Sequence, residues 1–294
     1  MWREVSTTET FEQYRPLLFG LAYQMLGSVM AAEDLVQESF LRWQGVNQEE
    51  VSHPKAYLFT VLTHLCLDTL RSASVQREEY VGPWLPEPLV RARAPDVSDT
   101  VALTDTLSTA FLLLLQRLSP IERAVFLLHD IFDYGFADVA RIVGKSEANC
   151  RQIARRARQQ LAAQRPRFHP SSEEQARMVQ QFVQTCATGD MSSLVSLLAE
   201  DVTLYSDGGG KAAAALKPIH GPEKVARFLL AILAKAPPGL ELRFEEVNGQ
   251  PGFIVYDGPR PYSVFTFDIA GGRIQAIYTV VNPDKLQVVP SQAG

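Results

Sequence analysis

Cysteines and long hydrophobic runs are both scarce in this sequence. Its three cysteines, Cys66, Cys150 and Cys186, are spread over 294 residues. They fit neither a disulfide framework nor a zinc cluster, and we expect buried thiols in a reducing cytoplasm. No run reaches the roughly 20 apolar residues that span a bilayer, and the segment MWREVSTTETFEQY lacks the pattern of a secretory signal. These absences predict a cytoplasmic protein with no membrane contact, metal site or cofactor, and the length of 294 residues predicts two or three domains.

Positive charge is in the minority overall, since 28 Lys and Arg stand against 33 Asp and Glu and give a net charge of −5. One stretch reverses that sign. Between Arg141 and Arg167, eight basic residues accompany a single acid, Glu147. Such a patch indicates a surface for a polyanion, the alternative being a solvated basic helix face with no partner.

The same stretch predicts a helix-turn-helix. Ser119 and Glu122 form a capping box before a first helix. A short second helix at 136–143 stops at Gly144, and Ser146 caps a basic third helix. These are the parts of a major-groove reader. The DNA-contact candidates are Lys145, Ser146, Asn149, Arg151, Gln152, Arg155, Arg156 and Arg158.

The N-terminal part, up to about residue 74, is predicted to be helical. Apolar residues recur at helical spacing from Phe11 to Met25, and Gly27 ends that helix. Ser28 caps a second helix with an acidic outer face. A third helix runs over 55–71, after the break at His53-Pro54.

Residues 75–100 are rich in proline and predict a linker. Within it lies the apolar segment GPWLPEP, at 82–88. An exposed Trp84-Leu85 pair in a linker indicates docking onto a domain surface. An apolar helix at 101–118 is expected to pack beneath the helix-turn-helix.

After a second break at 165–170 the pattern changes to helices followed by strands. Gly-containing turns at Asp257-Gly258 and Gly271-Gly272 predict hairpins. This order favours an α+β cone of antiparallel strands that curls around a pocket. The expected helices are 173–188, 191–198 and 223–236, and the expected strands are one ending at 204–205, 240–247, 252–256, 262–269 and 273–281.

Three motifs in this order resemble the extracytoplasmic-function sigma factors of the sigma-70 type. They are AEDLVQESFLRW, HPKAYLFTVLTHLCLDTLRS and the helix-turn-helix stretch, which together cover about residues 8–165. The resemblance implies two all-α domains, with domain 2 at 8–75 and domain 4 at 101–166, joined by a linker at 76–100. It also implies that the chain binds core RNA polymerase, through the β′ clamp and β flap regions, and reads the −10 and −35 promoter elements.

The resemblance assigns roles to two further residue sets. One departure affects the second set, because Thr63-His64 stands where the family often has Arg-Asn. From the residues alone, Tyr57 and Phe59 are also read as core, and Asp68 as an ion-pair partner of Arg71. The polymerase-binding set is Glu33, Asp34, Gln37, Glu38, Arg42 and Trp43. The −10 set is Lys55, Tyr57, Thr60, His64, Asp68 and Arg71.

The C-terminal part, at 171–287, resembles the SnoaL-like branch of the NTF2-like fold. Together, WLPEP, DGGGK and NPDKL resemble the SigJ-like subgroup of sigma factors, in which such a domain is fused behind domain 4. The resemblance implies a domain that regulates the sigma domains, and we expect Trp84 and Leu85 to dock on it. The interdomain set is Trp84, Leu85, Pro86, Asp207, Gly208, Gly209, Gly210, Lys211, Asn282, Pro283, Asp284 and Lys285.

An enzymatic or small-molecule-binding C-terminal domain, fused to a DNA-binding segment, is the alternative. Relatives of this fold include isomerases and hydrolases, and an unidentified small ligand could occupy the cone. No charged pair stands at a spacing that demands catalysis, so we expect regulation rather than turnover. The acid and base candidates are Asp201, Asp207, His220, Asp257 and Tyr278.

Overall fold

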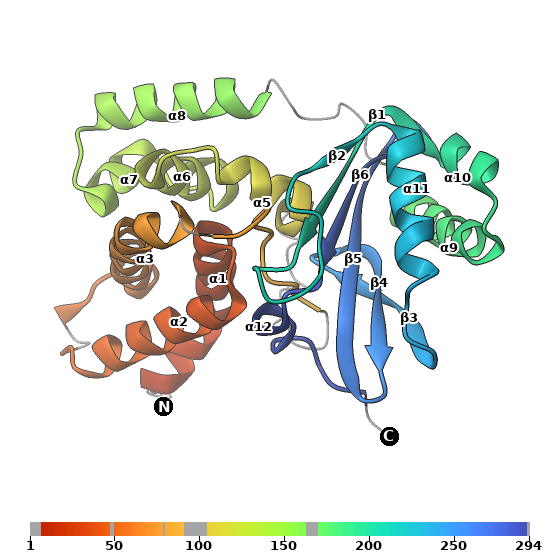
Figure 1. Ribbon diagram of the computed structural model, residues 1–294. Coiled ribbons are helices and arrows are strands. Elements are labelled where there is room, and N and C mark those ends of the chain that lie inside the picture. The colour runs from red at the N-terminus through yellow and green to blue at the C-terminus, as the bar shows by residue number, and fades with distance from the viewer. Residues whose placement is uncertain (1–6, 48–49, 79, 91–104, 163–169, 293–294) are drawn as a thin grey trace. The chain divides into compact units, whose positions relative to one another are not determined.

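The computed structural model divides the chain into two compact units (Figure 1). The first comprises Met1–Glu78, Pro95–Leu107 and Phe111–Arg165, and the second comprises Glu79–Ala94, Ser108–Ala110 and Pro166–Gly294. The structure describes residues 7–47, 50–78, 80–90, 105–162 and 170–292. The end of the expected linker (91–100), the start of the expected helix at 101, Arg165, Arg167 and most of the break at 165–170 lie outside these residues.

Three helices open the first unit: α1 (Thr7–Leu26), α2 (Val29–Gln44) and α3 (Pro54–Glu78). The Ser28 side chain accepts a hydrogen bond of 3.1 Å from the Ala31 amide, so α2 begins where the cap predicted. Helix α3 extends seven residues beyond the expected end at Arg71. The first residues of the expected linker, 76–78, are therefore helical.

Within the described residues 105–118, the expected helix at 101–118 is replaced by the 3₁₀ turn η3 (Asp105–Leu107) and the short helix α5 (Thr109–Leu115). The helix-turn-helix follows as α6 (Pro120–Phe126), α7 (Phe136–Val143) and α8 (Glu147–Ala162), with a π-helical turn, η4 (Leu127–Ile131), after α6. Ser119 and Glu122 form both hydrogen bonds of the predicted capping box. Gly144 ends α7 with φ of 65°.

The N-terminal helices and the helix-turn-helix share one core. The Phe59 ring of α3 contacts Phe132 and Tyr134, at centroid distances of 5.4 and 5.2 Å. Arg123 of α6 is buried and donates to the Leu115 carbonyl, at 2.9 Å, and to the Met25 carbonyl. These contacts explain why both groups of helices belong to one unit.

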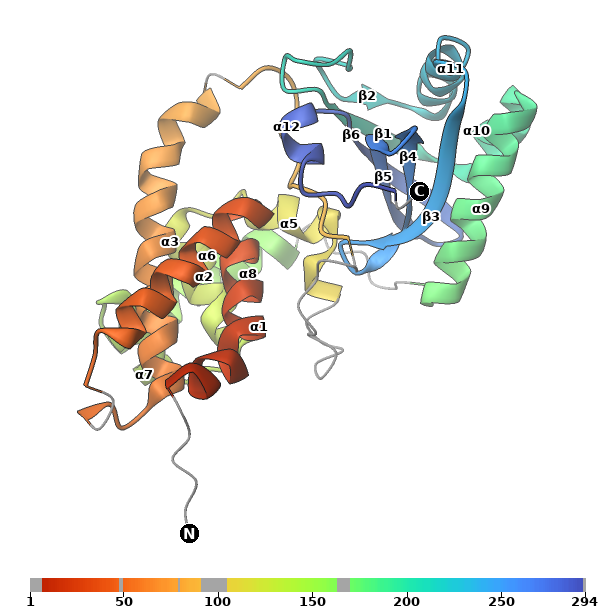
Figure 2. The same ribbon diagram turned by 90° about the horizontal axis from the view of Figure 1, so that it is seen from below.

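The second unit is a sheet covered on one face by helices (Figures 1 and 2). Strand order is β2-β1-β6-β5-β4-β3, and β1 runs parallel to β6. The expected sheet was wholly antiparallel, so this one pairing corrects it. The strands are β1 (Leu198–Asp207), β2 (Ile219–His220), β3 (Leu240–Val247), β4 (Gln250–Asp257), β5 (Arg260–Ala270) and β6 (Arg273–Val280); the helices are α9 (Ser172–Thr188), α10 (Met191–Leu197), α11 (Pro222–Leu233) and α12 (Pro283–Leu286).

Apolar side chains pack between the sheet and its helices. Phe182 of α9 meets Phe267 at 5.1 Å, and Phe253 stacks on Phe265 at 4.6 Å. These rings belong to one cluster with Val225 and other residues of α10, α11 and β1. This cluster packs the helices on one face of the sheet, and a pocket of about 310 Å³ remains between α9 and strands β3 and β4.

Candidate functional site

Helix α8 presents its polar residues to solvent. Its buried stripe consists of Cys150, Ile153, Ala154, Ala157 and Leu161. All eight predicted −35 residues are exposed: Lys145, Ser146, Asn149, Arg151, Gln152, Arg155, Arg156 and Arg158. The helical spacing of the apolar residues therefore gives α8 one face that packs against the core and one basic face that is exposed.

The arginines of α8 differ in their ion pairs. Arg151 pairs with Glu147 and lies 4.7 Å from the centre of the Phe136 ring, and Arg158 pairs with Asp130 at 2.7 Å. In the described part of the chain, Arg155 has no carboxylate within ion-pair distance. Arg155 is thus a strong candidate for a phosphate contact.

The predicted −10 residues on α3 fall into different surroundings. Lys55 lies 5.4 Å from the centre of the Tyr134 ring, and Tyr57 is half-buried against Trp43 at 5.7 Å. The Thr60 hydroxyl donates to the Ala56 carbonyl within its own helix. Asp68 and Arg71 form the exposed ion pair that their spacing allowed, at 3.0 Å. Phe59 is fully buried, which agrees with its reading as a core residue.

His64 connects α3 to the helix-turn-helix. Its Nε2 lies 2.7 Å from the Ile142 carbonyl oxygen of α7. Beside it is a cavity of about 630 Å³, whose walls include Asp68, Arg71 and Lys145. The structure therefore brings residues of the two predicted DNA-binding sets to the lining of one cavity within the first unit.

The predicted polymerase-binding set needs one correction. Glu33, Asp34, Gln37 and Arg42 are exposed on α2, and Glu38 pairs with Arg42 at 2.9 Å. Trp43 is only 1% exposed, so its side chain belongs to the core and not to a docking surface. The buried stripe of α2 is Val29, Ala32, Val36, Ser39 and Trp43.

Asp207, the last residue of β1, forms the centre of the predicted interdomain set. Its carboxylate is fully buried. It accepts hydrogen bonds from the Tyr80 hydroxyl at 2.5 Å, the Leu85 amide at 2.8 Å and the Lys285 ammonium at 2.7 Å. Linker residues 80 and 85 thus both donate hydrogen bonds to one buried carboxylate of the C-terminal domain.

Lys285 of α12 contacts the same linker segment. Its ammonium donates to the Leu85 carbonyl at 2.5 Å and lies 4.1 Å from the centre of the Trp84 ring and 4.9 Å from that of Tyr80. Two ring faces, a carbonyl and a carboxylate replace the water that this cation loses on burial. Lys285 and Asp207 thus both hold the Trp84-Leu85 pair within the second unit.

The glycine loop allows the backbone to approach this cluster. Gly209 has φ of 58°, and a Cβ there would lie 2.2 Å from Nδ2 of Asn282 and 3.1 Å from the Tyr80 oxygen. Asn282 in turn donates to Tyr80 at 2.9 Å and caps α12 by accepting from the Asp284 amide.

The remaining members of the set occupy different positions. Pro86 is buried, whereas Lys211 and Asp284 form an exposed ion pair at 2.5 Å. Gly208 and Gly210 flank the close approach, and Pro283 is exposed at the start of α12. Lys211 therefore fastens the loop to α12 at the surface, away from the buried charge.

Two residues that hold the linker on the C-terminal domain, one from each side of the contact, were not predicted from the sequence. Tyr80 precedes the proline-rich segment, and its phenol pKa is raised well above its usual value by burial and by the hydrogen bond to Asp207. Asn248 lies in the β3–β4 turn with φ of 54°. Its amide donates to the Leu89 carbonyl at 2.8 Å, next to a bridge between Val90 and Val247. The Asn248-Gly249 dipeptide was an available hairpin signal.

The acid and base candidates do not converge. Asp201 and Asp257 are exposed, and Nδ1 of His220 meets the Thr203 hydroxyl at 3.1 Å. Tyr278 stacks on Tyr205 at 5.5 Å, and burial raises the pKa of its phenol. Asp207 is engaged by the linker. In the described part of the chain these five residues therefore form no common acid–base site, and no three His, Cys, Asp or Glu side chains gather as a metal site.

Two of the expected buried thiols are found as predicted. Cys66 and Cys150 are buried, and Cys186 is half-buried; burial raises the pKa of the Cys186 thiol to about 12. Among the residues that the structure describes, no helix has the length and apolar character needed to cross a bilayer.

Comparison with protein families defines the class. The chain matches "Sigma-70 region 2" over residues 10–75, "Sigma-70, region 4" over 108–161 and "SnoaL-like domain" over 179–281. These matches place α1–α3, the helix-turn-helix and the α+β domain in one order of sigma regions followed by a SnoaL-like domain.

Relatives of known class cover nearly the whole chain. It is 38% identical to the ECF RNA polymerase sigma factor SigJ of Mycobacterium tuberculosis, over 95% of this chain and 93% of that protein. It is 29% identical to the probable sigma factor SigI of the same species, over 96% and 95%. The crystal structure of SigJ matches with a TM-score of 0.76 and 34% identity, over 95% of this chain and 98% of that one. The chain therefore belongs to the ECF RNA polymerase sigma factors, which confirms the resemblance and the predicted fold class.

Proposed function

We propose that α8 reads the −35 element, that α3 contributes to recognition of the −10 element, and that α2 contacts the β′ clamp of core RNA polymerase while domain 4 contacts the β flap. The exposed basic face of α8 and the exposed acidic face of α2 support these assignments. In this proposal residues 8–75 and 101–166 act as domains 2 and 4, with a regulatory domain at 171–287.

We further propose that the C-terminal domain regulates initiation by holding the linker. The observation that carries this is the buried Asp207 carboxylate, which accepts from Tyr80, Leu85 and Lys285. Because the partners belong to one chain, a modest contact suffices to keep the segment bound. The linker connects the two promoter-reading domains, so holding it constrains both.

Run-off transcription with core polymerase tests this proposal. Trp84→Ala removes a ring that covers Lys285, and we expect the transcript yield to change at least about threefold, because side-chain contacts of this kind contribute about 1 kcal/mol or more. Phe244→Ala is the control, because it removes an aromatic side chain that is 47% exposed on β3. Equal yields for wild type, Trp84→Ala and the control would refute regulation through the linker.

The −35 assignment has its own test in the salt dependence of promoter binding by the holoenzyme. If Arg155 neutralises a phosphate, Arg155→Ala should reduce the slope of log K against log salt by about 1. Arg227→Ala, an exposed arginine of α11, is the control for the loss of one charge. An unchanged slope for Arg155→Ala would remove this residue from the phosphate contacts.

A further inference from the structure

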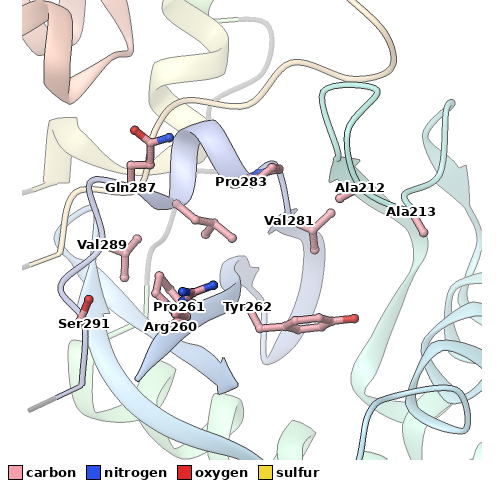
Figure 3. Close-up of a pocket in the computed structure, with 11 residues that line it drawn as sticks. Ala212, Ala213, Arg260, Pro261, Tyr262, Val281, Pro283, Gln287, Val289 and Ser291 are labelled. Atoms are coloured by element: carbon pink, nitrogen blue, oxygen red, sulfur yellow. The ribbon is translucent and has the colours of Figure 1, made fainter. Parts of the chain in front are cut away.

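A pocket of about 420 Å³ lies in the second unit, next to α12. Its walls come from the loop after β1, the start of β5 and the segment from Val281 to Ser291. Figure 3 shows the Tyr262 ring between β5 and the loop that carries Ala212 and Ala213. The volume is within the range of small-molecule sites.

The chemistry of the lining is asymmetric. Most of the wall is apolar, with Val281, Leu286 and Val289 beside the Tyr262 ring. Of the eleven described residues that line the pocket, Arg260 alone carries a charge. Asp257 faces Arg260 across the β4–β5 hairpin, yet no ion pair joins Arg260 to a carboxylate within the described residues. An apolar hollow with one uncompensated guanidinium suits an anion with an apolar body.

We propose that this pocket binds a small amphipathic carboxylate. Its carboxylate would pair with Arg260, whose planar guanidinium presents two parallel donors. Its apolar body would cover Val281, Leu286 and the Tyr262 ring. A cationic ligand finds no acidic partner in this lining, and a neutral one leaves the guanidinium without an anion.

The pocket is connected to the docked linker through α12. Leu286 lines the pocket, and its neighbour Lys285 holds Leu85 and Asp207. Since α12 has only four residues, a ligand that shifts Leu286 also displaces Lys285. The bound ligand therefore acts as an effector of linker docking. Docking of the linker in turn changes the affinity for the ligand by the same factor. This step rests on the docking part of the proposed function.

Calorimetric titration of the full chain with 4-phenylbutyrate tests the site. We expect saturable 1:1 binding, about 10-fold weaker for the uncharged amide of the same acid and for Arg260→Gln, because hydrogen bonds to a charged group are lost. Arg273→Gln, an exposed arginine at the start of β6, should bind as wild type does. Absence of saturable binding, or equal binding by Arg260→Gln, would overturn the proposed site.

Hydrogen exchange of the Leu85 amide, which donates to Asp207, tests the connection to the linker. We expect saturating 4-phenylbutyrate to change its exchange rate at least about threefold, and Arg260→Gln to remove this response. Binding with no change in that rate would refute the connection. In the ligand-free chain, slow exchange of the Leu85 amide reports docking itself. Fast exchange there would refute the docking proposal and not the pocket.

Discussion

Lys285→Met is expected to release the linker segment from the C-terminal domain. Methionine keeps a stem of similar length but leaves the Asp207 carboxylate buried with neutral donors only, from Tyr80 and Leu85. Breaking a buried ion pair by removing one partner costs about 3–5 kcal/mol. That cost corresponds to at least a 100-fold faster exchange of the Leu85 amide, measured by NMR under conditions where exchange reports local opening.

The chain supplies a matched control in Lys211, the lysine of the glycine loop. Lys211 pairs with Asp284, but both side chains are more than half exposed. Lys211→Met should therefore change the same exchange rate by less than about fivefold, which corresponds to about 1 kcal/mol. Adding Asp207→Asn to Lys285→Met removes the stranded charge and should recover part of the protection. If Lys285→Met and Lys211→Met behave alike, the buried pair does not hold the segment.

Gly209→Ala is expected to damage the same contact from the loop side. At φ of 58° an alanine is strained, and its Cβ collides with the Asn282 amide group. Left-handed backbone alone costs about 1–2 kcal/mol for a residue with a Cβ. Displacing Asn282 also removes its bond to Tyr80 and its cap on α12. We therefore expect the free energy that holds the docked segment to fall by about 3 kcal/mol, measured from the exchange of the Leu85 amide.

Gly258→Ala separates the effect of backbone strain from that of the collision with Asn282. Gly258 has φ of 55°, but a Cβ there meets no atom within 4 Å. It should therefore show backbone strain in its own hairpin and leave Leu85 protection unchanged. Similar effects of the two substitutions on Leu85 would mean that the close approach of the glycine loop is unimportant. A reduced effect of Gly209→Ala in an Asn282→Ala background would identify the collision as the cause.

Local signals in the sequence predicted most helix limits correctly. The Ser119–Glu122 capping box, the Ser28 cap and the stop at Gly144 depend on hydrogen bonds within a few residues, which the sequence displays directly. The hairpins that join β4 to β5 and β5 to β6 were found in the same way, from their glycine turns. The order of helices and strands therefore followed from short-range chemistry.

Long-range partners explain what the sequence could not predict. The bond of Tyr80 joins it to a residue 127 positions away, and the parallel pairing of β1 with β6 crosses the whole domain. The family resemblance placed Trp43 in the polymerase-binding set, whereas tertiary packing decides which edge of its helix is covered. Family resemblance supplied the interdomain motifs, but it gave no sign that Asp207 and Lys285 would form the buried pair.

The contacts of the held segment also limit the covalent distance between α3 and η3. Residues 79–104 separate α3 from η3, and 26 fully extended residues reach about 90 Å. With residues 80–90 held on the C-terminal domain, only one residue precedes the held segment, and the 14 that follow reach at most about 50 Å. Because these contacts fix the span of the eleven held residues, they remove up to about 40 Å of extensible chain from the connection between α3 and η3.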